Sequence, residues 1–132
     1  MMQNKNLALL KVALIIFVIV TIVYGLCYVF IPQALVEMSG GDPVHSSWLR
    51  WPGCTLIALG IGAIMVLRNP AKQDIFIITI ALGTLLTGLA LLYTWIFEMP
   101  VAAWFIAMPT IIILINSALL WWSRQQAKEI IK

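Results

Sequence analysis

The chain has 132 residues, of which 63% are hydrophobic and 10% are charged, and its formal net charge at pH 7 is +3. Soluble domains contain roughly 45–50% apolar and about 25% charged residues, so this chain has too few polar side chains to cover a water-facing surface. The composition excludes a soluble globular protein and indicates one integral membrane domain over residues 1–132. Nucleic-acid binding is not expected, because the basic residues lie at the ends of apolar segments.

The first apolar segment, residues 7–31, is long enough to cross a bilayer as a helix. It ends at Pro32, which cannot continue a helix with a normal hydrogen bond. Residues 33–47 form the one connection with room for structure of its own. We expect a short helix over residues 33–38 that lies at the membrane interface, followed by a turn at residues 40–43.

Three further spans are predicted over residues 48–67, 75–97 and 101–122. Arg68-Asn69-Pro70 ends the second span, and Glu98-Met99-Pro100 forms a short hairpin before the fourth. Four apolar helices joined by short connections predict an all-α, integral membrane, antiparallel four-helix bundle.

The lysines and arginines predict the orientation of these spans. With a cytoplasmic N-terminus, Arg50 is the one basic residue on the outer side. The inner side then holds Lys5, Lys11, Arg68, Lys72, Arg124, Lys128 and Lys132. All connections are short, so the positive-inside rule places the protein in the cytoplasmic (inner) membrane with both termini in the cytoplasm.

Small residues recur at helical spacing on every span. Lipid chains are as apolar as leucine, so membrane helices associate where small residues let their backbones approach closely. The predicted packing residues are Gly25, Ala58, Gly60, Gly62, Gly83 and Thr87. We expect the third span to be central. The alternative is that these faces line a pore or a ligand cavity.

No charged residue lies near the middle of any predicted span. Proton-coupled transporters typically keep an ionisable residue at that depth, so this class is disfavoured. Asn116 is the deepest side chain with strong hydrogen-bonding capacity. Either it makes a hydrogen bond between helices, or it takes part in substrate binding.

Polar residues of the kinds used in acid–base chemistry gather on the predicted outer side. They are Glu37, Asp42, His45, Arg50 and Glu98. Their spacing matches no catalytic motif, and a single histidine makes a metal site unexpected, so no catalytic residue, metal or cofactor is predicted. The simplest interpretation is solvated loop charges with one ion pair, such as Arg50 with Glu98. Arg50 is also the best candidate for holding a lipid phosphate or another anionic ligand.

The two cysteines, Cys27 and Cys54, lie near the outer ends of adjacent predicted spans. A disulfide requires their Cα atoms to lie within about 7 Å in an oxidising compartment. The alternative is that both side chains serve as small apolar packing groups.

The second span contains Arg50-Trp51-Pro52-Gly53, then the run from Ala58 to Gly62, then Arg68-Asn69-Pro70. This pattern resembles small four-helix membrane proteins of the DoxX-like kind. That group includes subunits of quinone-linked oxidoreductases and many members of unknown role. The resemblance implies that an accessory role in a membrane complex is plausible, and it carries over no catalytic residue.

Three functions remain open from the sequence. The leading hypothesis is a non-enzymatic accessory or scaffold subunit, in a larger membrane complex or a homo-oligomer and surrounded by membrane lipids. The second is a binder or carrier of a hydrophobic or anionic amphiphile, a lipid or a quinone, near the outer leaflet. The third is a membrane enzyme that uses the outer polar residues.

Overall fold

The structure, a computed structural model, describes residues 2–38, 40, 49–98 and 103–127, and within these residues it is entirely helical. Its elements are α1 (Met2–Phe30), α2 (Pro32–Met38), α3 (Arg50–Arg68), the 3-10 helix η2 (Pro70–Lys72), α4 (Asp74–Tyr93), the π-helical segment η3 (Thr94–Glu98) and α5 (Ala103–Gln126). The predicted all-α class is therefore confirmed for the described residues.

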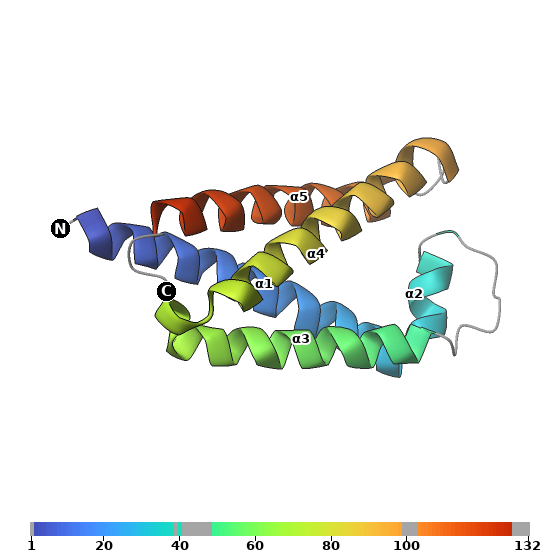
Figure 1. Ribbon diagram of the computed structural model, residues 1–132. Coiled ribbons are helices and arrows are strands. Elements are labelled where there is room, and N and C mark those ends of the chain that lie inside the picture. The colour runs from blue at the N-terminus through green and yellow to red at the C-terminus, as the bar shows by residue number, and fades with distance from the viewer. Residues whose placement is uncertain (1, 39, 41–48, 99–102, 128–132) are drawn as a thin grey trace.

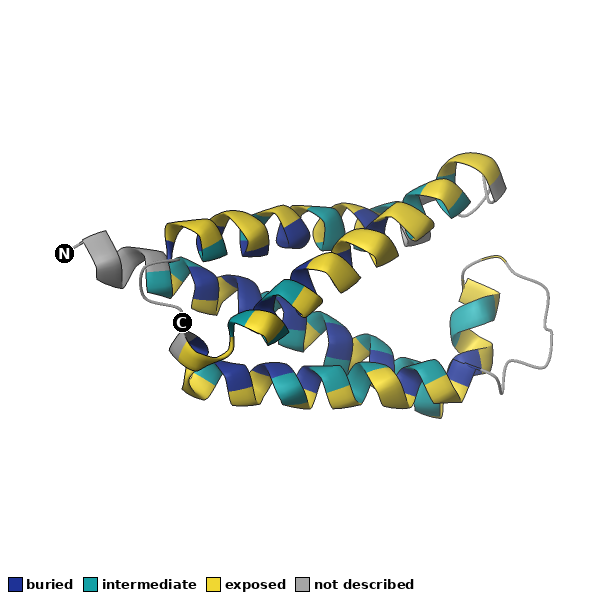
Figure 2. Ribbon diagram, viewed as in Figure 1, coloured by how far each residue is buried: buried dark blue, intermediate teal, exposed yellow. Residues whose placement is uncertain are grey.

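Three stretches of helix are long and apolar enough to cross a membrane: Leu7–Phe30, Arg50–Arg68 and Asp74–Phe97. They correspond to the first three predicted spans. Large apolar side chains are exposed along the helices, among them Ile75 at 83% and Met65 at 66%. Figure 2 shows such exposed positions on every long helix. This pattern suits a hydrocarbon solvent, because water would disfavour so much exposed apolar surface.

The segment boundaries follow local signals in the sequence. Helix α1 ends at Phe30, two residues before Pro32, and α2 begins at Pro32, where a short interfacial helix is expected. Helix α3 ends at Arg68, and Pro70 begins η2. Of the predicted turn at residues 40–43, the structure describes Gly40, whose φ of 76° is a left-handed conformation that glycine adopts without steric cost. The other turn residues lie outside the described part of the chain.

Helix α1 is the central element, and not the predicted third span. It packs against both α3 and α5, while α4 packs mainly against α5 and continues into η3. Figure 1 shows α3 and α4 separating from each other beyond their short connection. The two resulting pairs, α1 with α3 and α4 with α5, diverge toward the end that carries α2.

Close backbone approach holds α1 against α3. A Cβ atom placed on Gly25 would lie 2.8 Å from Cγ1 of Ile57 and 3.0 Å from the carbonyl oxygen of Gly53. One placed on Gly60 would lie 2.7 Å from Cδ1 of Ile22. Gly25 of α1 lies beside Gly53 of α3, and Ile22 of α1 lies beside Gly60 of α3. The residue number falls along α1 as it rises along α3, so the two helices are antiparallel. The missing side chains allow the van der Waals contact that drives helix association in membranes.

The buried core lies at the end of the molecule where α1 begins and α5 ends. It includes Leu10 and Leu14 of α1, Val66 of α3, Ile77 of α4 and Leu120 of α5. All four long helices therefore meet at this end. Toward the opposite end the two helix pairs separate, and the space between them becomes a cavity.

Candidate ligand cavity between the helix pairs

A partly open cavity of about 590 Å³ lies between the α1–α3 pair and the α4–α5 pair. Its closed end, called the floor below, includes Phe17 and Ile80, which also belong to the buried core. Its other end, called the mouth below because the helix pairs diverge toward it, includes Leu35 and Val36 of α2 and Leu49. The volume falls within the range of about 300–1,000 Å³ that is typical of small-molecule sites.

Most of the cavity wall is apolar, and several of its threonines have no free hydroxyl hydrogen to offer a ligand. Three threonine hydroxyls donate to the backbone carbonyl oxygen four residues earlier: Thr21 to Phe17 at 2.8 Å, Thr79 to Ile75 at 2.9 Å and Thr84 to Ile80 at 2.8 Å. Each hydroxyl hydrogen is therefore already used within its own helix. These residues present mainly methyl groups and one acceptor oxygen to a ligand.

Besides the threonines and the two tyrosines Tyr24 and Tyr28, the polar side chain described in this wall is Asn116 of α5. It lines the cavity, its side chain is only 5% exposed, and its Oδ1 atom has no hydrogen-bond partner. The next residue, Ser117, donates through Oγ to the carbonyl oxygen of Ala81 at 3.0 Å and joins α5 to α4. Of the two interpretations of Asn116 drawn from the sequence, the interhelical hydrogen bond is made by its neighbour, Ser117.

Two of the predicted packing residues line this cavity. A Cβ atom placed on Gly83 would meet no other atom within 4 Å, and Thr87 is exposed to the cavity space. Neither residue allows a close helix contact, because the helix pairs have already separated at this level. Ala58 is also exposed, on α3.

The other predicted packing residues lie in contacts. Gly25 and Gly60 face α1–α3 contacts, as described above. A Cβ atom on Gly62 would lie 2.7 Å from Cζ of Phe76, the ring of a flexible side chain from α4. The predicted packing residues thus differ: Gly25, Gly60 and Gly62 lie at close contacts, whereas Gly83 and Thr87 line open space.

The outer polar residues are only partly described. Asp42, His45 and the side chain of Glu98 lie outside the described part of the chain. Glu37 is exposed and accepts a hydrogen bond from Gln33 at 3.0 Å through Oε1. Arg50 is exposed, and its Nε donates to the carbonyl oxygen of Val29 at 3.3 Å. Arg50 does not line the cavity, so its predicted role with an anionic ligand stays a prediction.

The cysteines are free thiols in the structure, Cys27 half-buried and Cys54 exposed. The disulfide considered from the sequence is therefore not formed here. Among the residues that the structure describes, no group of three histidine, cysteine or acidic side chains could hold a metal ion.

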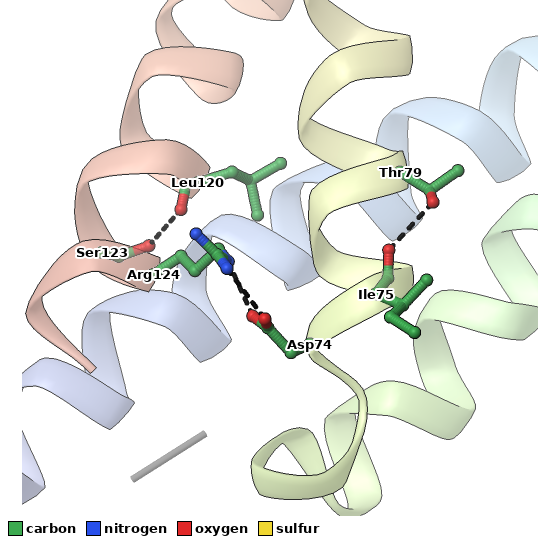
Figure 3. Close-up of polar contacts among 6 residues, drawn as sticks. All are labelled: Asp74, Ile75, Thr79, Leu120, Ser123 and Arg124. Carbon is green, nitrogen blue, oxygen red and sulfur yellow. Dashed lines mark hydrogen bonds and ion pairs between the residues drawn. The ribbon is translucent and has the colours of Figure 1, made fainter. Parts of the chain in front are cut away.

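An ion pair that the sequence reasoning missed joins the ends of α4 and α5 (Figure 3). Nε of Arg124 lies 2.6 Å from Oδ1 of Asp74, and Nη2 lies 2.8 Å from Oδ2. The Arg124 guanidinium also lies 5.8 Å from the ring centroid of Trp121. The hydrogen-bonded carboxylate raises the pKa of Arg124 above its usual value. The available signal was that Asp74 directly precedes the predicted span of residues 75–97, while Arg124 follows the end of its antiparallel neighbour, residues 101–122.

Comparison with known proteins decides the family. The model of the domain of unknown function DUF4345 matches residues 9–123, which is most of the chain. The protein belongs to the DUF4345 family. No curated protein and no solved structure matches it. The DUF4345 match contains every residue that lines the cavity, while none of these comparisons links the chain to DoxX-like proteins.

The cavity of this DUF4345 domain has a distinct chemical character. None of the described residues that line it is charged. Burying a charge in such surroundings is costly unless it is paired, so the cavity suits an uncharged, largely apolar molecule. Oδ1 of Asn116 is the buried side-chain oxygen of the described residues that lacks a hydrogen-bond partner, and it can orient such a molecule.

Proposed function

We propose that this protein is a multi-pass membrane protein that binds a hydrophobic molecule taken from the bilayer. The observation that carries the proposal is the cavity of about 590 Å³ between the two helix pairs. Tight helix packing is the norm in folded proteins, where voids larger than a water molecule are few. An apolar space of this size in a chain of 132 residues is best explained by a ligand that fills it.

The proposal takes α5 as a fourth span. Two contacts support this choice: Ser117 bonds to Ala81, and Arg124 pairs with Asp74. As the residue number rises on α5, that of its partner falls on α4, so the two helices are antiparallel. Because α4 is long and apolar enough to cross a membrane, the helix that follows it back crosses as well. The distribution of lysine and arginine then favours cytoplasmic termini in the inner membrane.

A filled cavity tests the proposal. Gly83→Phe adds a ring at a position where a Cβ meets no atom within 4 Å, so the ring can occupy the cavity without displacing a helix. Leu86→Phe is the matched control, because Leu86 lies on the same helix, is 66% exposed and does not line the cavity. Each variant is extracted gently from its membrane and examined by native mass spectrometry.

We expect the wild type and Leu86→Phe to retain a small-molecule mass that Gly83→Phe loses. Equal retention in all three proteins, or none in any of them, contradicts the proposal. Arg50→Ala belongs in the same experiment. Retention of the ligand by Arg50→Ala supports binding in the cavity, whereas loss of the ligand favours the anionic amphiphile near the outer leaflet.

The accessory-subunit hypothesis remains a prediction, and the same spectra address it. Its predicted contact residues were small side chains on the helix faces. In the structure Gly60 contacts Ile22 within the chain, while Gly83 and Thr87 line the cavity. A second protein at fixed stoichiometry in all the spectra would favour the accessory role. The enzyme hypothesis also remains a prediction, since it depends on residues that include Asp42 and His45.

A further inference from the structure

We infer that the ligand is an uncharged lipid with a hydroxyl head group, and that it lies with this hydroxyl at the cavity floor, donating to Oδ1 of Asn116. The inference rests on the proposed function and names the ligand class for the same cavity. A lipid in this orientation has its head inside the protein and its chain toward the mouth, the reverse of an amphiphile with its head at the membrane surface.

The orientation follows from where the polar atom lies. Asn116 precedes Ser117, which bonds to Ala81, and Ala81 belongs to the buried core beneath the cavity. Asn116 therefore lies near the floor. The mouth is lined by the aliphatic side chains of Leu35, Val36 and Leu49, and Tyr28 of α1 also lines the cavity. Because the buried oxygen that lacks a partner lies near the floor, we place the polar end of the ligand inward.

The requirement for a donor follows from the unpaired oxygen. A buried carbonyl oxygen without a partner is destabilising, because its hydration is lost and nothing replaces it. Oδ1 of Asn116 is in this condition. The amide torsion of asparagine is broad, so a rotation about the Cβ–Cγ bond turns the oxygen toward the cavity space. A hydroxyl hydrogen arriving there satisfies an atom that the protein leaves unsatisfied.

The requirement for neutrality follows from the wall. The described lining residues carry no charge, so a carboxylate or phosphate head at the floor would be buried without a partner. The hydroxyls of Thr21 and Thr84 cannot donate to such a head freely, since both already donate to their own helix. A neutral hydroxyl needs one acceptor, and Asn116 supplies it.

The test uses three probes with the same chain: hexadecanol, its methyl ether and palmitate. The methyl ether keeps the oxygen but cannot donate, and palmitate carries a charge near neutral pH. Each probe competes with tritiated hexadecanol for the purified full-length protein in detergent micelles. The proteins are the wild type, Asn116→Leu and Gly83→Phe.

We expect the wild type to bind hexadecanol about tenfold more tightly than either competitor, as one buried hydrogen bond implies. In Asn116→Leu the preference over the methyl ether should disappear, while hexadecanol still binds. Equal binding of the alcohol and the ether by the wild type overturns the inference, because Oδ1 then bonds to water and not to the ligand.

The two proposals fail in distinguishable ways. Binding of both alcohol and ether that Gly83→Phe abolishes leaves the proposed function intact and removes only the hydroxyl assignment. Tighter binding of palmitate than of hexadecanol by the wild type also overturns the inference, because it requires an anionic ligand. If Gly83→Phe binds all three probes like the wild type, the cavity is not the site and both proposals fail.

Discussion

At the scale of single residues, Asn116 and Ser117 are neighbours on α5 with opposite expected effects on stability. Oδ1 of Asn116 is buried without a partner, while Oγ of Ser117 bonds to the carbonyl oxygen of Ala81. A side chain kept for ligand binding stabilises the complex and destabilises the empty protein. The contrast between the two residues separates a binding role from a packing role.

We expect Asn116→Leu to raise the free energy of unfolding of the ligand-free protein by about 1 kcal/mol, since it removes an unsatisfied buried group. Ser117→Ala should lower it by about 0.6 kcal/mol, the average for a hydrogen bond between membrane helices. Thermal unfolding of both variants in detergent, after removal of bound lipid, measures the difference. A lower Tm for Asn116→Leu than for the wild type would contradict the prediction.

At the scale of the elements, the α1–α3 contact and the cavity use glycine for opposite reasons. A Cβ atom on Gly53 would lie 2.8 Å from Cβ of Tyr28 and 2.9 Å from the carbonyl oxygen of Gly25. A Cβ atom on Gly83 would meet nothing within 4 Å. The same substitution at the two positions therefore changes packing at one and only cavity volume at the other.

We expect Gly53→Val to destabilise the protein by about 1–3 kcal/mol, because the backbones of α1 and α3 must move apart to admit the side chain. Gly83→Val should cost less than about 0.5 kcal/mol, the usual range for a substitution that meets no neighbour. Thermal unfolding in the same detergent compares them. Similar losses at Gly53 and Gly83 would show that helix propensity and not packing controls the effect.

The Asp74–Arg124 ion pair joins the first turn of α4 to the last turn of α5. Its side chains are 31% and 13% exposed, and the contact is bidentate. We expect a double-mutant cycle with Asp74→Asn and Arg124→Gln to give a coupling energy of about 1–2 kcal/mol, above the roughly 0.2–1 kcal/mol of exposed pairs. A coupling energy near zero would contradict this prediction.

The pH dependence of this ion pair follows from the sign of the pKa shift. A raised pKa of Arg124 contributes stability that is lost only as pH rises through the raised value. The guanidinium therefore stays charged throughout the physiological range. Unfolding measured between neutral and mildly alkaline pH should show no loss attributable to Arg124.

At the scale of the whole molecule, α5 decides on which side of the membrane the chain ends. Four crossings return the C-terminus to the side of the N-terminus, whereas three crossings leave it opposite. We expect a green fluorescent protein fused to the C-terminus to fluoresce and alkaline phosphatase fused there to be inactive. The opposite result, with the N-terminus shown to be cytoplasmic, would mean that α5 does not cross.

The sequence by itself predicted helices long and apolar enough to cross a membrane, the helical class and most segment ends. Composition is sufficient for the first two, because a hydrocarbon solvent requires apolar surfaces and internally satisfied backbones. Local signals are sufficient for the ends, since Pro32 and Pro70 interrupt helices whatever surrounds them. The short helix after Pro32 was also predicted, because it depends on adjacent residues alone.

Only the tertiary structure decided which small residues pack and which line a cavity. Gly25 and Gly83 are equivalent in the sequence, each a glycine within an apolar helix. They differ because the backbones of α1 and α3 pack closely against each other, whereas α4 diverges from both helices. The pairing of Asp74 with Arg124 and the unpaired oxygen of Asn116 have the same origin. Each depends on distances between helices that are far apart along the chain, and these distances are set by the packing of all four long helices together.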